Sequence, residues 1–140
     1  MQRYYISPNE FKIGVEYLLT VLPKGKYKKL VIICKGGKIL GELLKTSLNI
    51  DNVDFVFVSN YKDKKLVGNE SVKVIGDDVL VVDDILDTGT TLRDVETDVC
   101  VWCIKKRDEY KCKKIKNLYY YKEFDKDTWV VFPWEGVSLE

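Results

Sequence analysis

The sequence predicts an α/β fold in which helices flank a central, mainly parallel, twisted sheet. Apolar runs at residues 30–34, 79–82 and 99–104 are continuous and rich in β-branched side chains, as in strands that a parallel sheet buries on both faces. Turn residues and helical patterns separate these runs, and such alternation is typical of βαβ units. Because 140 residues is the length of one domain, we expect a single domain over residues 1–140.

A helix is expected to begin after Ser7. Ser7 can cap this helix, Pro8 suits its first position, and Glu10 can complete a capping box. Apolar side chains then recur at helical spacing as far as Leu22, and Pro23 marks the end.

Strands and helices are expected to alternate through the rest of the chain. A Lys-Gly-Gly turn follows the strand at 30–34, and a helical pattern begins near residue 39. A strand is expected at 53–58, and the polar, lysine-rich residues 60–69 should form a loop or hairpin. In the second half, a short β segment is expected at 71–75 and a buried strand at 79–82. About two turns of helix should follow at 90–96, then another buried strand at 99–104 and an edge strand at 117–121.

The composition excludes several functional classes. The 23 basic and 22 acidic side chains nearly cancel to a net charge of +1, which gives no support to nucleic-acid binding. No apolar stretch approaches the roughly 20 residues that cross a bilayer, and the first residues lack the apolar run of a signal peptide. We therefore expect a cytoplasmic protein with neither nucleic-acid nor membrane partners.

The counts of histidine and cysteine narrow the possible chemistry. With 0 histidines, histidine-based triads, dyads and metal sites are excluded, and a general base must be Asp, Glu, Lys, Tyr or Cys. Cys100 and Cys103 spell C-x-x-C, but within an apolar run where an offset of three places their side chains on opposite faces of a strand. We expect buried thiols here rather than a metal or redox site.

The segment that follows the strand at 79–82 carries the clearest functional pattern. Three aspartates come within five residues, and three threonines then surround a glycine: Asp83, Asp84, Asp87, Thr88, Gly89, Thr90 and Thr91. Ligands of open parallel sheets bind at the carboxyl ends of strands. Hydroxyls, a glycine and the start of the helix expected at 90–96 would suit a terminal phosphate.

The aspartates need a separate explanation, because carboxylates repel phosphates. Asp83 and Asp84 suit acceptor contacts to sugar hydroxyls, or a hard cation such as Mg2+. An ordinary turn with a helix cap explains one aspartate and one threonine, but not the whole set.

The stretch VVDDILDTGTT resembles the signature of the type I phosphoribosyltransferases, and the resemblance extends over residues 32–135. It implies that family's fold, with a small flexible lid or hood over the site. It also implies a glycosyltransferase of purine salvage that binds 5-phosphoribosyl-1-pyrophosphate with Mg2+, as a homodimer or homotetramer. Asp83 and Asp84 would then hold the ribose diol and the metal, and residues 88–91 the 5'-phosphate.

The resemblance also suggests which base accepts the phosphoribosyl group. Members that act on hypoxanthine, guanine or xanthine carry an aspartate at the position of Asp87. A 6-oxopurine must release or share a proton at N7 as N9 attacks the sugar, and a carboxylate can accept it as a general base. Asp87 is therefore the candidate catalytic residue, and a 6-oxopurine the expected substrate.

Two further segments resemble the family's pyrophosphate site. Lys35, Gly36 and Gly37 resemble its pyrophosphate loop, which often carries a non-proline cis peptide. An ordinary β-to-α turn would have the same sequence pattern. Residues 60–69 occupy the place of the lid. There Tyr61, Lys62, Lys64 and Lys65 either contact pyrophosphate or form a solvated face.

The C-terminal DTWVVFPWE resembles the tail of the xanthine–guanine branch. By that resemblance Trp129 stacks on the base, and the carbonyl of Val130 meets the substituent at the 2-position. Lys105 matches a lysine that donates to the 6-oxo group. Since Lys106 stands where proline is usual, either lysine could face the base.

The sequence leaves one rival function open. A non-catalytic module on the same fold could sense 5-phosphoribosyl-1-pyrophosphate or a nucleotide, because function depends on the site rather than the fold. Retention of all three aspartates and of the Lys-Gly-Gly turn favours the enzyme.

Overall fold

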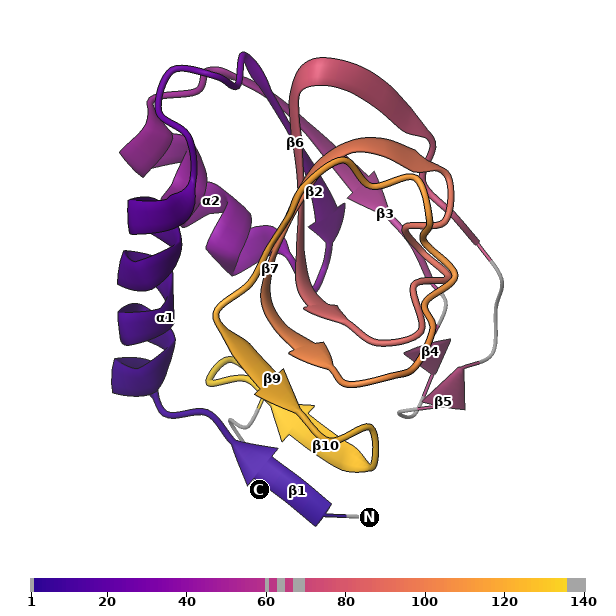
Figure 1. Cartoon of the computed structure of the whole chain (residues 1–140). Helices are drawn as coiled ribbons and strands as arrows, with labels where there is room; N and C mark the ends of the chain where they lie inside the picture. Colours follow the sequence, from indigo (N-terminus) through magenta and orange to yellow (C-terminus); the bar gives the residue numbers. More distant parts are fainter. Residues whose placement is uncertain (1, 60, 63–64, 67–69, 136–140) are drawn as a thin grey trace.

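The central sheet has the predicted parallel arrangement. The computed structural model describes residues 2–59, 61–62, 65–66 and 70–135. The main sheet has the strand order β3-β2-β6-β7-β8, and β9 also pairs with β7; all of these pairings are parallel. The strands are β2 (Lys29–Cys34), β3 (Asn52–Phe57), β6 (Val74–Leu86), β7 (Val95–Lys105), β8 (Leu118–Tyr119) and β9 (Lys122–Phe124) (Figure 1).

Both helices cover the same face of this sheet. They are α1 (Pro8–Val21) and α2 (Lys38–Leu48), and they lie together on one side of β2, β6 and β7 (Figure 1). The predicted cap of α1 is confirmed, because the amide of Glu10 donates to Ser7 Oγ at 3.0 Å. The capping box is only half formed: the Glu10 carboxylate instead accepts from Tyr4 OH and from Lys122 Nζ, the latter at 2.7 Å.

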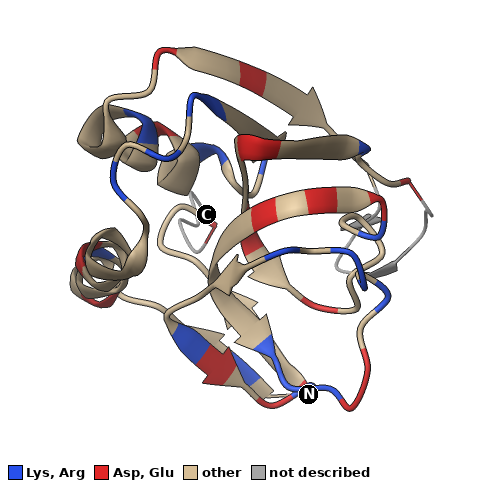
Figure 2. Ribbon diagram, turned by 45° about the horizontal axis from the view of Figure 1, so that its top comes forward, with Lys and Arg blue, Asp and Glu red and all other residues tan. Residues whose placement is uncertain are grey.

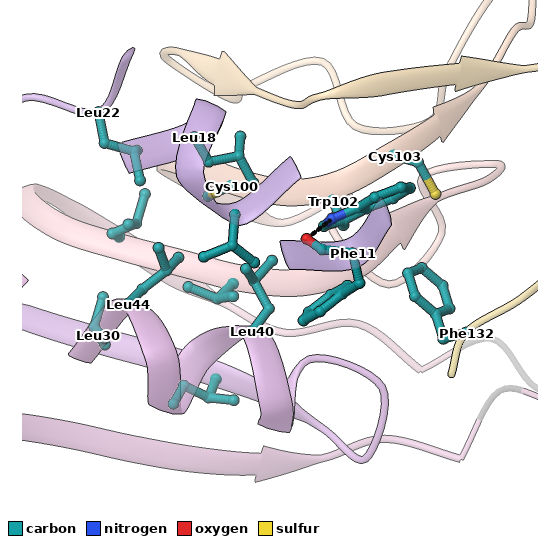
Figure 3. Close-up of a cluster of buried hydrophobic side chains, with 14 of the residues drawn as sticks. Phe11, Leu18, Leu22, Leu30, Leu40, Leu44, Cys100, Trp102, Cys103 and Phe132 are labelled. Carbon is teal, nitrogen blue, oxygen red and sulfur yellow. Dashed lines mark hydrogen bonds between the residues drawn. The ribbon is translucent and has the colours of Figure 1, made fainter. Parts of the chain in front are cut away.

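The larger core cluster fills the space between the helices and the sheet (Figure 3). Trp102 is fully buried, and its Nε1 donates to the carbonyl of Phe11 at 3.0 Å. A Cβ on Gly14 would lie 2.3 Å from that nitrogen, so glycine lets α1 approach the indole closely. This contact ties the first helix to β7.

The buried thiols are confirmed. Cys100 and Cys103 are buried and free, and burial raises the pKa of both thiols. Both belong to the same core cluster as Trp102 and Phe132 (Figure 3). The described part of the chain brings no three metal-ligating side chains together.

The helix expected at 90–96 is absent, and this prediction was wrong. Residues 88–94 form turns, and β7 already begins at Val95. The amide of Arg93 donates to the carbonyl of Thr90, and that of Val95 to Leu92, without continuing into a helix. Thr90, Thr91 and Val95 are β-branched, which disfavours helix and suits extended chain.

Long curved strands take the place of a helix on the second face. Both β6 and β7 begin well before their expected starts at residues 79 and 99, and both curve strongly (Figure 1). Their first residues pair, Val74 with Val95, and the amide of Val72 donates to the carbonyl of Thr91 at 2.9 Å. A second core cluster, which includes the buried Leu92 and Val95, forms beneath them.

Two small sheets complete the described chain. Strand β1 (Gln2–Tyr5) pairs in parallel with β10 (Thr128–Val131), which brings the N-terminus to the tail that carries Trp129. Strands β4 (Tyr61–Lys62) and β5 (Lys65–Leu66) form an antiparallel pair, as expected of a hairpin. Lys64 and the side chains of Tyr61, Lys62 and Lys65 lie outside the described residues.

Three further expectations can be compared with the structure. The edge strand expected at 117–121 is shorter, and β9 follows it on the same neighbour. Lysine and arginine are interspersed with aspartate and glutamate over helices, sheet and loops (Figure 2). Within the described part of the chain, no helix has the length and apolar character needed to cross a bilayer.

Candidate active site

A cavity of about 340 Å³ opens at the carboxyl ends of β2, β6 and β7. Twelve of the thirteen predicted site residues line it: Lys35, Gly36, Asp83, Asp84, Asp87, Thr88, Gly89, Thr90, Thr91, Lys105, Trp129 and Val130. The sequence prediction missed eight described lining residues, which are Ile33, Cys34, Val58, Ile85, Leu86, Leu92, Phe132 and Glu135. Most of these are apolar, and in the sequence they read as ordinary core positions.

Asp83 and Asp84 form a pair of carboxylates at the end of β6. The amide of Asp84 donates to Asp83 Oδ1 at 2.8 Å. Burial, and then the charge of Asp84, raise the pKa of Asp83 well above its usual range. Burial also raises the pKa of Asp84, although hydrogen bonds from Asp83 and from backbone amides partly offset this. No lysine or arginine of the described chain forms an ion pair with either carboxylate.

The Lys-Gly-Gly turn packs directly against that pair. A Cβ on Gly36 would lie 2.6 Å from Asp84 Oδ2, so glycine allows the carboxylate to approach the turn. Gly37 is not among the described lining residues; it lies behind the turn, where a Cβ would be 2.7 Å from the carbonyl of Val82. The Cys34–Lys35 peptide is cis, as the family resemblance implies, and Lys35 is exposed at the cavity.

The threonine segment forms a tight turn at the cavity instead of a helix N-terminus. Gly89 has φ +88°, and a Cβ there would lie 2.8 Å from Cys112 Sγ. The hydroxyls of Thr88 and Thr90 are 3.0 Å apart, and the carbonyl of Thr88 accepts from the amide of Lys111 at 2.8 Å. Without a helix dipole, the anion-binding groups that remain are hydroxyls and turn amides.

Asp87, Lys105 and Trp129 meet on the other side of the cavity. Lys105 is buried, with its Nζ 3.9 Å from Asp87 Oδ2 and 5.2 Å from the centroid of the Trp129 ring. Lys106 points away and pairs with Glu123 at 3.4 Å. Of the two candidate lysines, the structure thus places Lys105 at the cavity.

Trp134 has a packing role. Its ring stacks on Phe132 with centroids 4.9 Å apart and meets Phe11 edge-on at 5.1 Å. The two tryptophans of the tail therefore differ, since Trp129 lines the cavity and Trp134 packs on the core.

Arg107 is a potential functional residue that the sequence prediction missed. Its NH2 donates to Asp87 Oδ1 at 2.7 Å, and its Nε donates to the Asp87 carbonyl at 3.0 Å. It lies in the strongly charged run KKRDEYKCKKIK, where no local pattern distinguishes it from its neighbours.

The chain is similar in sequence to known enzymes. No family model matches the chain. The xanthine-guanine phosphoribosyltransferase of Idiomarina loihiensis is 27% identical over 131 residues, which cover 81% of this chain and 74% of that protein. The enzyme of the same name from Chromohalobacter salexigens is 28% identical over 144 residues, covering 98% and 87%.

Solved structures show the same fold. A purine phosphoribosyltransferase from Pyrococcus horikoshii superposes with a TM-score of 0.70 at 22% identity, covering 100% of this chain and 99% of that one. A xanthine-guanine-hypoxanthine phosphoribosyltransferase from Helicobacter pylori gives 0.67 at 20% identity, covering 96% and 93%. The chain therefore shares its fold with these proteins over nearly its whole length.

Proposed function

We propose that this chain, a relative of the type I phosphoribosyltransferases with their fold, is a purine phosphoribosyltransferase of purine salvage. It would convert 5-phosphoribosyl-1-pyrophosphate and guanine, xanthine or hypoxanthine to the nucleoside 5'-monophosphate and pyrophosphate. One observation carries the proposal. A single cavity joins the aspartate pair and threonine turn, which suit the donor, to Asp87, Lys105 and Trp129, which suit a 6-oxopurine.

The reaction forms one bond and breaks another at the same carbon. Purine N9 bonds to C1' of the ribose while the bond from C1' to the pyrophosphate oxygen breaks, and the purine gives up one proton. The protein's contribution is to hold the two reactants together and to stabilise the charge that develops.

The acceptor half of the site offers one hydrogen-bond donor and one acceptor side by side. Lys105 Nζ would donate to the 6-oxo group, and Asp87 Oδ2, 3.9 Å away, would accept from the adjacent N7. Trp129, next to Lys105, would stack on the purine ring, and the carbonyl of Val130 would meet the group at the 2-position. An adenine offers a donor where Lys105 needs an acceptor, so this arrangement favours 6-oxopurines.

The donor half would hold a charged sugar phosphate. Thr88, Thr90 and Thr91, with the amides of the turn, would hold the 5'-phosphate. Lys35 and the amide of Gly36 would face the leaving pyrophosphate on the opposite wall. Asp83 and Asp84 would accept from the ribose hydroxyls.

The same two aspartates suit Mg2+ as a cofactor. They are hard oxygen ligands with no protein cation beside them in the described chain. Mg2+ usually takes one or two carboxylates and completes its coordination with water and substrate phosphates. When bound, Mg2+ would supply positive charge to the pyrophosphate oxygens.

A single assay tests the activity. The protein is incubated with Mg2+, the donor and, in turn, guanine, xanthine, hypoxanthine, adenine, uracil and orotate, and pyrophosphate release is measured. We expect release with at least one 6-oxopurine. No release with any base would overturn the enzyme in favour of a sensing module, and release with adenine alone would contradict the role of Asp87.

Assembly and location remain predictions from the family resemblance. A homodimer or homotetramer is expected, in the cytoplasm, and light scattering after size-exclusion chromatography tests the first of these.

A further inference from the structure

We infer that Arg107 is a positioning residue for Asp87, and this inference rests on the proposed function. Arg107 binds Asp87 at two points. Its Nε donates to the Asp87 carbonyl at 3.0 Å and to Oδ1 at 3.2 Å, while its NH2 donates to the same Oδ1 at 2.7 Å. Because the guanidinium is rigid and planar, these bonds fix the carboxylate relative to its own backbone.

The two carboxylate oxygens of Asp87 have different neighbours. Arg107 occupies Oδ1, whereas Oδ2 faces Lys105 Nζ at 3.9 Å. Lys105 lines the cavity, so the oxygen beside it is the one that a purine edge can reach. Without Arg107, the Asp87 side chain could rotate about Cα–Cβ and turn its carboxylate away from Lys105.

Arg107 acts from outside the cavity. It is not among the described residues that line the cavity, and its side chain is 29% exposed, against 19% for Asp87 and 8% for Lys105. It therefore reaches the substrate only through Asp87. This separates it from a residue that binds pyrophosphate or base directly.

The segment that carries Arg107 is anchored independently of this ion pair. The amide of Lys111 donates to the carbonyl of Thr88 at 2.8 Å, Gly89 packs against Cys112, and Tyr110 OH donates to the carbonyl of Lys105. Removing the guanidinium should leave the segment, and with it the donor site, in place. The effect of Arg107 on catalysis can thus be separated from any effect on folding.

The test compares Arg107→Met with Lys106→Met, a matched control that removes a neighbouring exposed cation paired with Glu123. For Arg107→Met we expect kcat with a 6-oxopurine to fall roughly 10- to 100-fold, the scale on which losing the outer partner of an active-site group acts. The Kd of the donor with Mg2+ should not change. Arg107→Lys keeps the charge without the fork, so it should recover only part of the loss.

A double-mutant cycle decides whether Arg107 acts through Asp87. In the Asp87→Asn background, Arg107→Met should have little further effect on kcat. Two full, multiplicative losses would overturn the inference, as would unchanged kcat in Arg107→Met or an equal loss in the Lys106 control. Weakened donor binding in Arg107→Met would also contradict it.

Failure of the proposed function would appear differently, as a wild-type protein without turnover. In that case crystal structures of the wild type and of Arg107→Met still test the inference. It requires the Asp87 carboxylate to leave its orientation in the variant, and an unmoved Asp87 would overturn it.

Discussion

Aspartates at opposite ends of the parallel sheet differ in burial and in surroundings: Asp98 is buried, whereas Asp83 and Asp84 are half-buried at the cavity. Near the amino-terminal end of β7, Asp98 is 2% exposed and accepts from Lys26 Nζ at 2.8 Å, Tyr27 OH at 2.6 Å and Asn117 Nδ2 at 2.9 Å. At the carboxyl end of β6, the carboxylates of Asp83 and Asp84 have only each other and backbone amides as hydrogen-bond partners in the described chain.

The pKa values of these aspartates move in opposite directions. Burial by itself would raise the pKa of Asp98, but the three side-chain donors outweigh burial and hold that pKa below its usual range. The pKa of Asp83 is raised by burial and by the charge of Asp84. A buried carboxylate is therefore not a functional signal by itself. The signal is a carboxylate at a cavity whose pKa is raised and which has no cation beside it in the described chain, because a ligand can supply one.

Loss of Asp98 should have the largest effect on stability. Asp98→Ala leaves Tyr27 OH buried without its acceptor, and we expect the free energy of unfolding to fall by about 2–3 kcal/mol, as for a buried polar group left unsatisfied. Urea unfolding measures this. In the folded protein, the affinity for 5-phosphoribosyl-1-pyrophosphate should stay unchanged, because Asp98 lies at the far end of the sheet. Weaker binding of 5-phosphoribosyl-1-pyrophosphate without a loss of stability would mean that Asp98 is a functional residue rather than a structural one.

Asp83→Asn should show the opposite pattern. The affinity for 5-phosphoribosyl-1-pyrophosphate should fall about 10- to 100-fold, since a hydrogen bond to a charged group contributes about 1.5–3 kcal/mol. The folded protein should become more stable at neutral pH, because the variant no longer holds a poorly solvated charge beside Asp84. Calorimetric titration with the donor and Mg2+, and thermal unfolding without them, measure the two effects. Lower stability combined with intact binding would make Asp83 a structural residue like Asp98.

Tyr27→Phe refines the comparison by removing one of the three donors to Asp98. Lys26 and Asn117 remain, so we expect a loss of only about 1–1.5 kcal/mol in the free energy of unfolding. Urea unfolding of this variant beside Asp98→Ala gives the share that Tyr27 contributes. A loss as large as that of Asp98→Ala would mean that Tyr27 alone satisfies the carboxylate.

Local sequence predicted the functional end of the sheet better than the structural end. Asp83, Asp84 and residues 87–91 lie within nine consecutive positions, and they follow a run whose apolar character identifies it as a strand. The carboxyl end of a parallel strand is where ligands bind, so their place could be predicted. The group around Asp98 joins residues 71 and 19 positions apart, and no periodic pattern links positions so distant.

The sequence prediction made two errors, the helix expected at 90–96 and the omission of Arg107, and both concern contacts between distant parts of the chain. The turn at 88–94 depends on the pairing of Val74 with Val95 and on the contact of Gly89 with Cys112, both made by distant parts of the chain. Arg107 is found only when the fold brings it to Asp87, 20 residues away. The β-branched residues disfavour a helix at 90–96 without specifying the turn, and no local pattern distinguishes Arg107, so tertiary packing decides both.

The pH dependence of stability should show the smallest effect and the clearest difference in sign. The lowered pKa of Asp98 means that its contribution is fully present above the ordinary carboxyl pKa, about 3.9, and is lost as pH falls through the lowered value. The raised pKa of Asp83 means that its contribution to stability is present below about pH 3.9 and is lost as pH rises through the raised value.

Urea unfolding of the wild type, Asp98→Asn and Asp83→Asn between roughly pH 3 and 8 separates the contributions of the two aspartates. Relative to the wild type, Asp98→Asn should be least destabilised at the acid end, and Asp83→Asn should gain stability toward neutral pH. Parallel curves for the two variants would mean that the two ends of the sheet do not differ in the way their contacts indicate.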